Sequence, residues 1–86
     1  MEHTVLADAG DDIREASDVV HGPTREKLRK HARRVSEEAR SAEPDSEVLR
    51  RHQSALADVQ ETEDVTEEVG ELVESAREKI SSFLED

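Results

Sequence analysis

The chain contains no cysteine, which excludes a disulfide framework and any metal site built on thiolate ligands. Tryptophan and tyrosine are also absent, and Phe83 is the single phenylalanine. Proteins that bind single-stranded nucleic acid commonly stack bases on aromatic rings, so this composition disfavours that mode of binding. The core must come from 18 Val, Leu, Ile and Phe residues and nine alanines, which suffices for a thin helical bundle without a deep pocket.

Long apolar runs are missing as well. No stretch approaches the roughly 20 apolar residues that a membrane-spanning helix needs. Residues 1–10 have neither the basic start nor the apolar run of a signal peptide. We therefore expect a cytoplasmic protein that makes no contact with a membrane.

Acidic residues greatly outnumber basic residues. The chain has 23 Asp and Glu residues against 12 Lys and Arg residues, giving a net charge of −11, and asparagine is absent. Only three of the cations are lysines. At about 1 M salt the Debye length is near 3 Å, so surface carboxylates repel each other little while they keep the protein hydrated. Acidic surface and arginine in place of lysine predict a protein adapted to molar salt.

Apolar residues recur at helical spacing in four segments separated by short breaks. We expect helices at about residues 4–20, 23–41, 46–60 and 65–84 in a single domain covering 1–86. Short links place consecutive helices side by side, which predicts an all-α bundle of four short antiparallel helices, up-down-up-down. So short a chain buries only about two-thirds of its unfolded surface, so dimerisation could complete the bundle.

Glycine and proline mark the breaks. Gly22 suits the left-handed position that ends a helix, and Pro23 suits the first turn of the next helix. Pro44 stops the second helix, after which Asp45 or Ser46 can cap the third.

The C-terminal segment is the most clearly amphipathic. Asp64 can cap its start, and Glu67 follows at the spacing of a capping box. Its carboxylates fall on the side away from the apolar stripe. The stripe occupies an arc of about 120° and consists of Val65, Val69, Leu72, Val73, Ala76, Ile80, Phe83 and Leu84. Such a stripe requires partner helices.

The first two expected helices have weaker stripes. Gly10 costs about 1 kcal/mol relative to alanine in a helix, so the first turns of the first helix are expected to fray. In the second helix only two of the stripe residues are large, which predicts close packing through alanine or a place at the edge of the bundle. This stripe is Leu28, Ala32, Val35, Ala39 and Ala42.

The third expected helix contains the run Arg51-His52-Gln53-Ser54-Ala55-Leu56, and Glu43-Pro44-Asp45 precedes it. This block resembles one in small acidic proteins of haloarchaea, a family of unknown function in which an Arg-His-Gln-Asn-Ala-Leu run follows a Gly-Pro-Asp segment. Ser54 and Glu43 depart from that pattern. The resemblance implies a halophilic archaeal protein and brings no activity.

The second expected helix carries a basic face, with net charge +5 over residues 24–36. With Arg51 and His52 of the next helix, it supplies the candidate interaction residues. The basic face consists of Arg25, Lys27, Arg29, Lys30, Arg33 and Arg34.

Two readings compete for the basic face. It could pair with the acidic faces of the first and fourth helices or with a protein partner, including another copy of the chain. It could instead contact nucleic-acid phosphates, although molar salt and the acidic remainder of the surface oppose that. We expect the structural or protein-binding reading.

The histidines are candidates for a different chemistry. Asp18 and His21 have the spacing of a helical metal-binding pair, but no second pair completes a coordination shell, so we expect no metal. His52 lies within the apolar face of its helix, and we expect it to be at least half buried against the first or fourth helix or a second subunit.

The sequence contains no motif that indicates an enzyme. The chain has no Gly-rich phosphate loop, nucleophile elbow or His-Glu-x-x-His run. We therefore expect no catalytic residues and no cofactor. The composition and the stripes favour a non-enzymatic module for protein interaction or self-association, and the alternative is a nucleic-acid-associated protein that uses the basic face.

Overall fold

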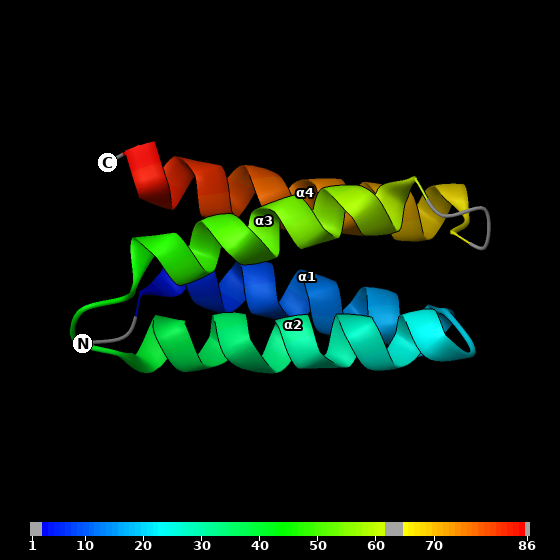
Figure 1. Cartoon of the computed structure of the whole chain (residues 1–86), viewed down its shortest axis with the longest axis horizontal. Coiled ribbons are helices and arrows are strands. Elements are labelled where there is room, and N and C mark those ends of the chain that lie inside the picture. Colours follow the sequence, from blue (N-terminus) through cyan, green and yellow to red (C-terminus); the bar gives the residue numbers. More distant parts are fainter. Residues whose placement is uncertain (1–2, 62–64, 86) are drawn as a thin grey trace.

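A computed structural model describes residues 3–61 and 65–85 and contains four α-helices. These are α1 (Thr4–Val19), α2 (Pro23–Arg40), α3 (Ser46–Gln60) and α4 (Glu67–Glu85). They run antiparallel along the 35 Å long axis of the molecule, and no strand occurs among the described residues (Figure 1). The predicted all-α bundle is confirmed.

The helices form a ring in which each contacts two neighbours. α1 packs against α2 and α4, and α3 packs against α4 and, most sparsely, against α2. Within the described chain, the backbones of the two diagonal pairs do not approach each other, since no Cα atoms of these pairs lie within 8 Å. The α1–α2 side and the α3–α4 side are consequently opposite faces of the bundle, and the α2–α3 seam is its loosest junction.

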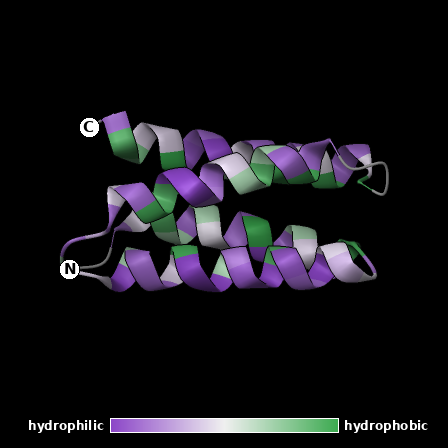
Figure 2. Cartoon of the chain, viewed as in Figure 1, coloured by the Kyte–Doolittle hydropathy of each residue, from purple (hydrophilic) through white to green (hydrophobic). Residues whose placement is uncertain are grey.

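The apolar stripes cover one another inside a single chain (Figure 2). Leu6, Ile13, Leu49, Leu56 and Ile80 are fully buried. Among the described residues, Val19 is the one large apolar side chain that is exposed, at 39%. No apolar stripe is left uncovered for a second copy, so a partner would have to contact the polar surface.

Gly10 allows α1 and α2 to approach closely. It is buried, and a Cβ at this position would lie 2.5 Å from Ser36 Oγ on α2. The helix begins at Thr4, before Gly10, so the weak point lies inside α1, where the missing side chain makes room for α2. Close packing through alanine follows on the same side, where Ala32 and Ala39 are buried.

The helix ends follow the predicted break residues with two changes. Gly22 does not take the left-handed helical conformation that was expected to end α1; its φ of +81° and ψ of −155°, a conformation open mainly to glycine, place it just before Pro23, which opens α2. Asp45 caps α3, because its Oδ1 accepts hydrogen bonds from the backbone N–H groups of residues 47 and 48. For α4 the cap is Thr66, whose Oγ1 accepts from the N–H of residue 69. The expected cap Asp64 lies outside the described residues.

The buried face of α2 differs from the expected stripe. Ala42 is exposed and lies beyond the helix, whereas Thr24 and Glu38 are buried. Thr24, His31 and Glu38 recur at intervals of seven residues, so they form a second row on α2, and this row faces α3. The junction between α2 and α3 is therefore a polar seam.

Candidate functional site

An arginine-lined cleft lies on the outer side of the α1–α2 pair. It encloses about 520 Å³. α1 contributes Arg14, and α2 contributes Arg29, Arg33 and Arg40; these four residues are named the arginine cleft. The three α2 members stand four and seven residues apart, which places them along one side of that helix. Ser17, Asp18, Ala32, Ser36 and Glu37 complete the lining.

None of the four cleft arginines forms an ion pair within the described chain, which distinguishes them from Arg34. The cleft holds four guanidinium groups and two carboxylates, so it is locally positive on a strongly acidic protein. Guanidinium groups present several N–H donors in a planar fork that matches carboxylate and phosphate oxygens. The arrangement therefore suits an anionic ligand with several acidic groups.

The expectation that the basic face pairs with α1 and α4 is wrong for the described residues. The ion pair that joins helices is between Lys79 of α4 and Asp12 of α1, at 2.7 Å. The same Asp12 Oδ2 accepts a hydrogen bond from Ser75 on α4, so this carboxylate is turned away from α2. The basic face thus remains available to groups outside the chain.

The structure does not gather the eight candidate residues into one site. Arg29 and Arg33 belong to the arginine cleft, and Lys27 lines a cleft on the other side of α2. Lys30 is exposed, and Arg25 is half-buried at the first turn of α2 with its Nε unbonded within the described chain.

The ion-pair partner of Arg51 lies on α3 and not on the basic face of α2. It pairs with Glu47 one turn earlier on α3, at 3.4 Å, and both side chains are about three-quarters exposed, at 76% and 77%. Such a pair contributes about 0–1 kcal/mol. Arg51 therefore takes no part in the candidate site, and the expectation that it would is not supported by its position.

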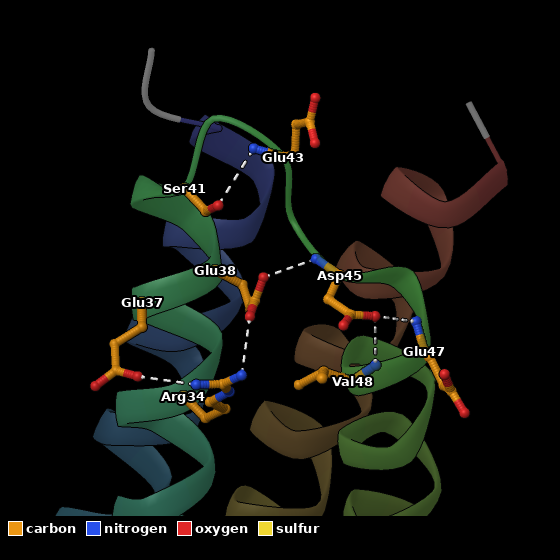
Figure 3. A network of polar contacts seen from close by, with 8 residues as sticks. All are labelled: Arg34, Glu37, Glu38, Ser41, Glu43, Asp45, Glu47 and Val48. Carbon is orange, nitrogen blue, oxygen red and sulfur yellow. Dashed lines mark hydrogen bonds and ion pairs between the residues drawn. The ribbon is translucent and has the colours of Figure 1, made fainter.

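Arg34 is the member of the basic face with carboxylate partners (Figure 3). Its guanidinium lies 3.4 Å from Glu37 and 3.3 Å from Glu38. Glu38 is 7% exposed and also accepts a hydrogen bond from the backbone N–H of Asp45, at 2.7 Å. This network ties the end of α2 to the start of α3, so Arg34 has a structural role.

His52 of α3 meets His31 of α2 across the polar seam. Their Nδ1 atoms are 2.7 Å apart and the rings are edge to face, with centroids 4.9 Å apart. The expectation that His52 is at least half buried is confirmed, but the helix it meets and hydrogen-bonds to is α2 and not α1 or α4. The reason is the ring order, which places α3 between α4 and α2.

Burial lowers the pKa of His31, and the nearby charges of His52 and Lys27 lower it further. Burial also lowers the pKa of His52, with Arg34 acting in the same direction and Glu38 opposing it. Two neutral rings can form this hydrogen bond, because one ring donates its Nδ1–H and the other accepts at Nδ1. Two charged rings would place two N–H groups face to face, so the pair can hold at most one extra proton.

The polar seam opens into a second cleft of about 460 Å³ beside this pair. Thr24, Lys27, His31, Ala55, Asp58 and Val59 line it. Among residues 3–61 and 65–85, no three His, Asp or Glu side chains come together as a group that could hold a metal ion. His21 is exposed after the end of α1, and His3 stacks edge to face on Phe83, with centroids 5.4 Å apart.

Sequence reasoning missed three of the residues that matter here, Arg14, Arg40 and His31. Arg40 follows Arg33 by seven residues, and Arg14 has no neighbour in sequence that reveals its position. His31 lies nine residues before the end of α2 and His52 lies six residues after the start of α3, so their spacing in the sequence did not reveal the pair.

Comparisons with known proteins give a family and no activity. The model of a family of unknown function, DUF7553, matches residues 1–86. Searches of curated proteins and of solved structures find no match. No described helix is long and apolar enough to cross a membrane.

Proposed function

Because the chain belongs to DUF7553, a family of unknown function, we propose its role from its own surface: it is a non-enzymatic module that binds an acidic protein partner through the basic face of α2. The unpaired state of that face supports this role. Five of its six cations have no carboxylate within ion-pair distance in the described chain, although acidic residues are nearly twice as numerous as basic ones. An acidic partner would supply the missing carboxylates.

The burial of the apolar stripes favours a partner that contacts the polar surface of the bundle. Since the apolar stripes are buried within one chain, hydrophobic docking has little surface to use. Charge complementarity then selects the partner, because it steers encounter and suppresses partners of the wrong sign. Direct contacts between guanidinium and carboxylate groups are screened less by salt than charges that remain apart in solvent.

We include in the proposal that the protein works in the cytoplasm of a halophilic archaeon, a setting that its composition supports. An excess of carboxylates keeps a protein hydrated in molar salt, and arginine dominates among its cations. In such a cytosol, binding to nucleic-acid phosphates weakens steeply, because it depends on the release of counterions. A protein partner is therefore favoured.

Nucleic acid is the second candidate, and the arginine cleft favours it. Four unpaired guanidinium groups together with Ser36 present donors of the kind that hold phosphates. Opposing it are the overall charge of −11 and the shortage of aromatic rings.

Binding of two fluorescent probes tests both candidates. A polyglutamate peptide and a DNA duplex would be titrated with the protein in low and molar salt, with anisotropy as the readout. We expect the peptide to bind, and Lys30→Glu/Arg33→Glu to weaken binding by about tenfold or more. The matched control is Arg50→Glu/Arg51→Glu, which makes the same charge change on exposed residues of α3 and should bind like the parent.

The outcomes separate the candidates. DNA that is retained in molar salt by the parent and lost by Lys30→Glu/Arg33→Glu would favour the nucleic-acid role instead. A parent that binds neither probe, or a control variant that loses binding equally, would show that the basic face is not the contact surface.

A further inference from the structure

A row of carboxylates runs along α4 on the opposite side of the bundle from the arginine cleft. Glu67, Glu71, Glu74 and Glu78 are exposed, and none forms an ion pair within the described chain. We call these four residues the acidic ridge. They line shallow clefts between α3 and α4, where Arg77 is the neighbouring cation. The α3–α4 side faces away from the α1–α2 side, because the four helices form a ring in which these two pairs lie opposite each other.

The two surfaces have the same spacing. The acidic ridge follows intervals of four, three and four residues. Arg29, Arg33, Ser36 and Arg40 on the cleft side of α2 follow the same intervals. Both rows therefore extend about 16 Å along their helices, given a rise of 1.5 Å per residue. Two helices laid side by side can bring each arginine opposite a glutamate, while Arg14 adds a fourth guanidinium from α1.

Charge is also divided between the two sides of the molecule. Residues 1–41 contain nine acidic and eight basic residues, whereas residues 42–86 contain 14 acidic and four basic residues. The α1–α2 side of one molecule is thus the surface least repelled by the α3–α4 side of another. In an isologous contact the same surface of both copies would meet, so surfaces of unlike charge would not be brought together.

We infer that a second copy of this chain docks its acidic ridge into the arginine cleft, so that copies associate head to tail. The inference rests on the proposed function and names the acidic partner as the chain itself. Since the two surfaces lie on opposite sides, each copy keeps a free ridge and a free cleft, and further copies can add to form a ring or a row.

Salt acts on this contact in two directions. Two molecules of net charge −11 repel each other over about 10 Å at 0.1 M salt, and over about 3 Å at 1 M. Ion pairs in direct contact lose less, because their separation is within the shorter Debye length and the docked helices exclude solvent. Association should therefore strengthen from low salt to intermediate salt before screening weakens the ion pairs.

Sedimentation of charge-reversal variants tests the inference. Arg29→Glu/Arg33→Glu should remain monomeric where the parent associates, and so should Glu71→Arg/Glu74→Arg. An equimolar mixture of the two should recover association, since the intact ridge of the first fits the intact cleft of the second. The two variants carry net charges of −15 and −7, so a general attraction between them cannot account for recovery.

Arg50→Glu/Arg51→Glu is the matched control, because it also has net charge −15 and changes residues that line none of the described clefts. It should associate like the parent, with a dissociation constant within about threefold, whereas each disruptive pair should raise that constant about tenfold or more. Circular dichroism would confirm that all variants keep their helices, as arginine and glutamate have similar helix propensities.

Three results would overturn head-to-tail docking. The parent could stay monomeric at millimolar concentration across the salt series, the reversals could leave its association unchanged, or the mixture could fail to recover it. A monomeric parent that still binds polyglutamate through the basic face would remove this inference and leave the proposed function standing. A parent that associates but shows no loss on Arg29→Glu/Arg33→Glu would count against both.

Discussion

The Nδ1 atoms of His31 and His52 lie 2.7 Å apart across the polar seam between α2 and α3. This contact joins the two helices that pack together most sparsely in the ring. Lys27 and Arg34 supply positive charge beside it, and Glu38 supplies negative charge. The histidine pair therefore couples the protonation of two side chains to the integrity of the loosest seam.

Stability should fall as the pH is lowered from 7.5 to about 5. The pKa of each ring is lowered in the folded state from its ordinary value of 6.5, so the unfolded chain takes up protons first as the pH falls. This uptake stabilises the unfolded chain relative to the folded chain, and the free energy of unfolding therefore falls below about pH 6.5. At pH 7.5 both rings are almost entirely neutral in both states, so the effect is absent there. Melting temperature across this pH range, followed by circular dichroism, is the measurement.

Substitution of the pair provides the control for this pH effect. His31→Leu/His52→Leu removes both titrating rings and leaves neither without its partner, so stability at pH 7.5 should change by less than about 1.5 kcal/mol while the pH dependence flattens. His21→Gln should keep the parental pH dependence, because His21 is exposed and bonds to neither ring. Equal pH dependence in the parent and the double variant would contradict the assignment.

Glu38 should be more important for stability than its neighbour Glu37. Glu38→Leu leaves the N–H of Asp45 and the guanidinium of Arg34 without their buried acceptor, which costs about 1–3 kcal/mol. Glu37→Leu affects an exposed pair, so the expected change is within about 0.5 kcal/mol. Urea denaturation of both variants measures the difference, and equal losses would show that the network in Figure 3 contributes nothing specific.

Gly70→Ala should stabilise the chain, whereas Gly10→Ala should leave its stability unchanged or lower it. A Cβ at Gly10 meets Ser36 Oγ at 2.5 Å, whereas a Cβ at Gly70 has nothing within 4 Å. Gly70→Ala should therefore stabilise α4 by about 0.5–1 kcal/mol, and the crowding at Gly10 should cancel or exceed that gain.

Removal of the crowding atom provides the rescue. Gly10→Ala/Ser36→Ala lacks Ser36 Oγ, so it should recover stability relative to Gly10→Ala alone. Thermal melts of the two single variants and the double variant would test this, with a shift of about 4–8 °C expected for each 1 kcal/mol. If Gly10→Ala stabilises the chain as Gly70→Ala does, the close approach of α1 and α2 is not limiting.

Helix content and melting temperature should rise from about 10 mM toward 2 M salt. The 23 carboxylates outnumber the cations by 11, and their repulsion is long-range only when salt is low. Circular dichroism across a series of potassium chloride concentrations measures this. Equal helicity and equal melting temperature at both ends of the series would remove the case for adaptation to molar salt.

The sequence alone was sufficient for the helices and their antiparallel succession. Apolar periodicity is a local property, and Gly22, Pro23 and Asp45 act on the backbone within a few residues of themselves. Each helix therefore begins and ends within two residues of its expected bounds, and the bundle follows because the stripes must cover one another.

Only the tertiary structure decided which side of each stripe meets which neighbour. A helix in a four-membered ring contacts two others, and periodicity shows which residues share a face without showing what lies opposite. For this reason His52 was expected against α1 or α4 and meets His31 of α2. Arg14 joins the α2 arginines for the same reason, because α1 and α2 pack closely where Gly10 has no side chain.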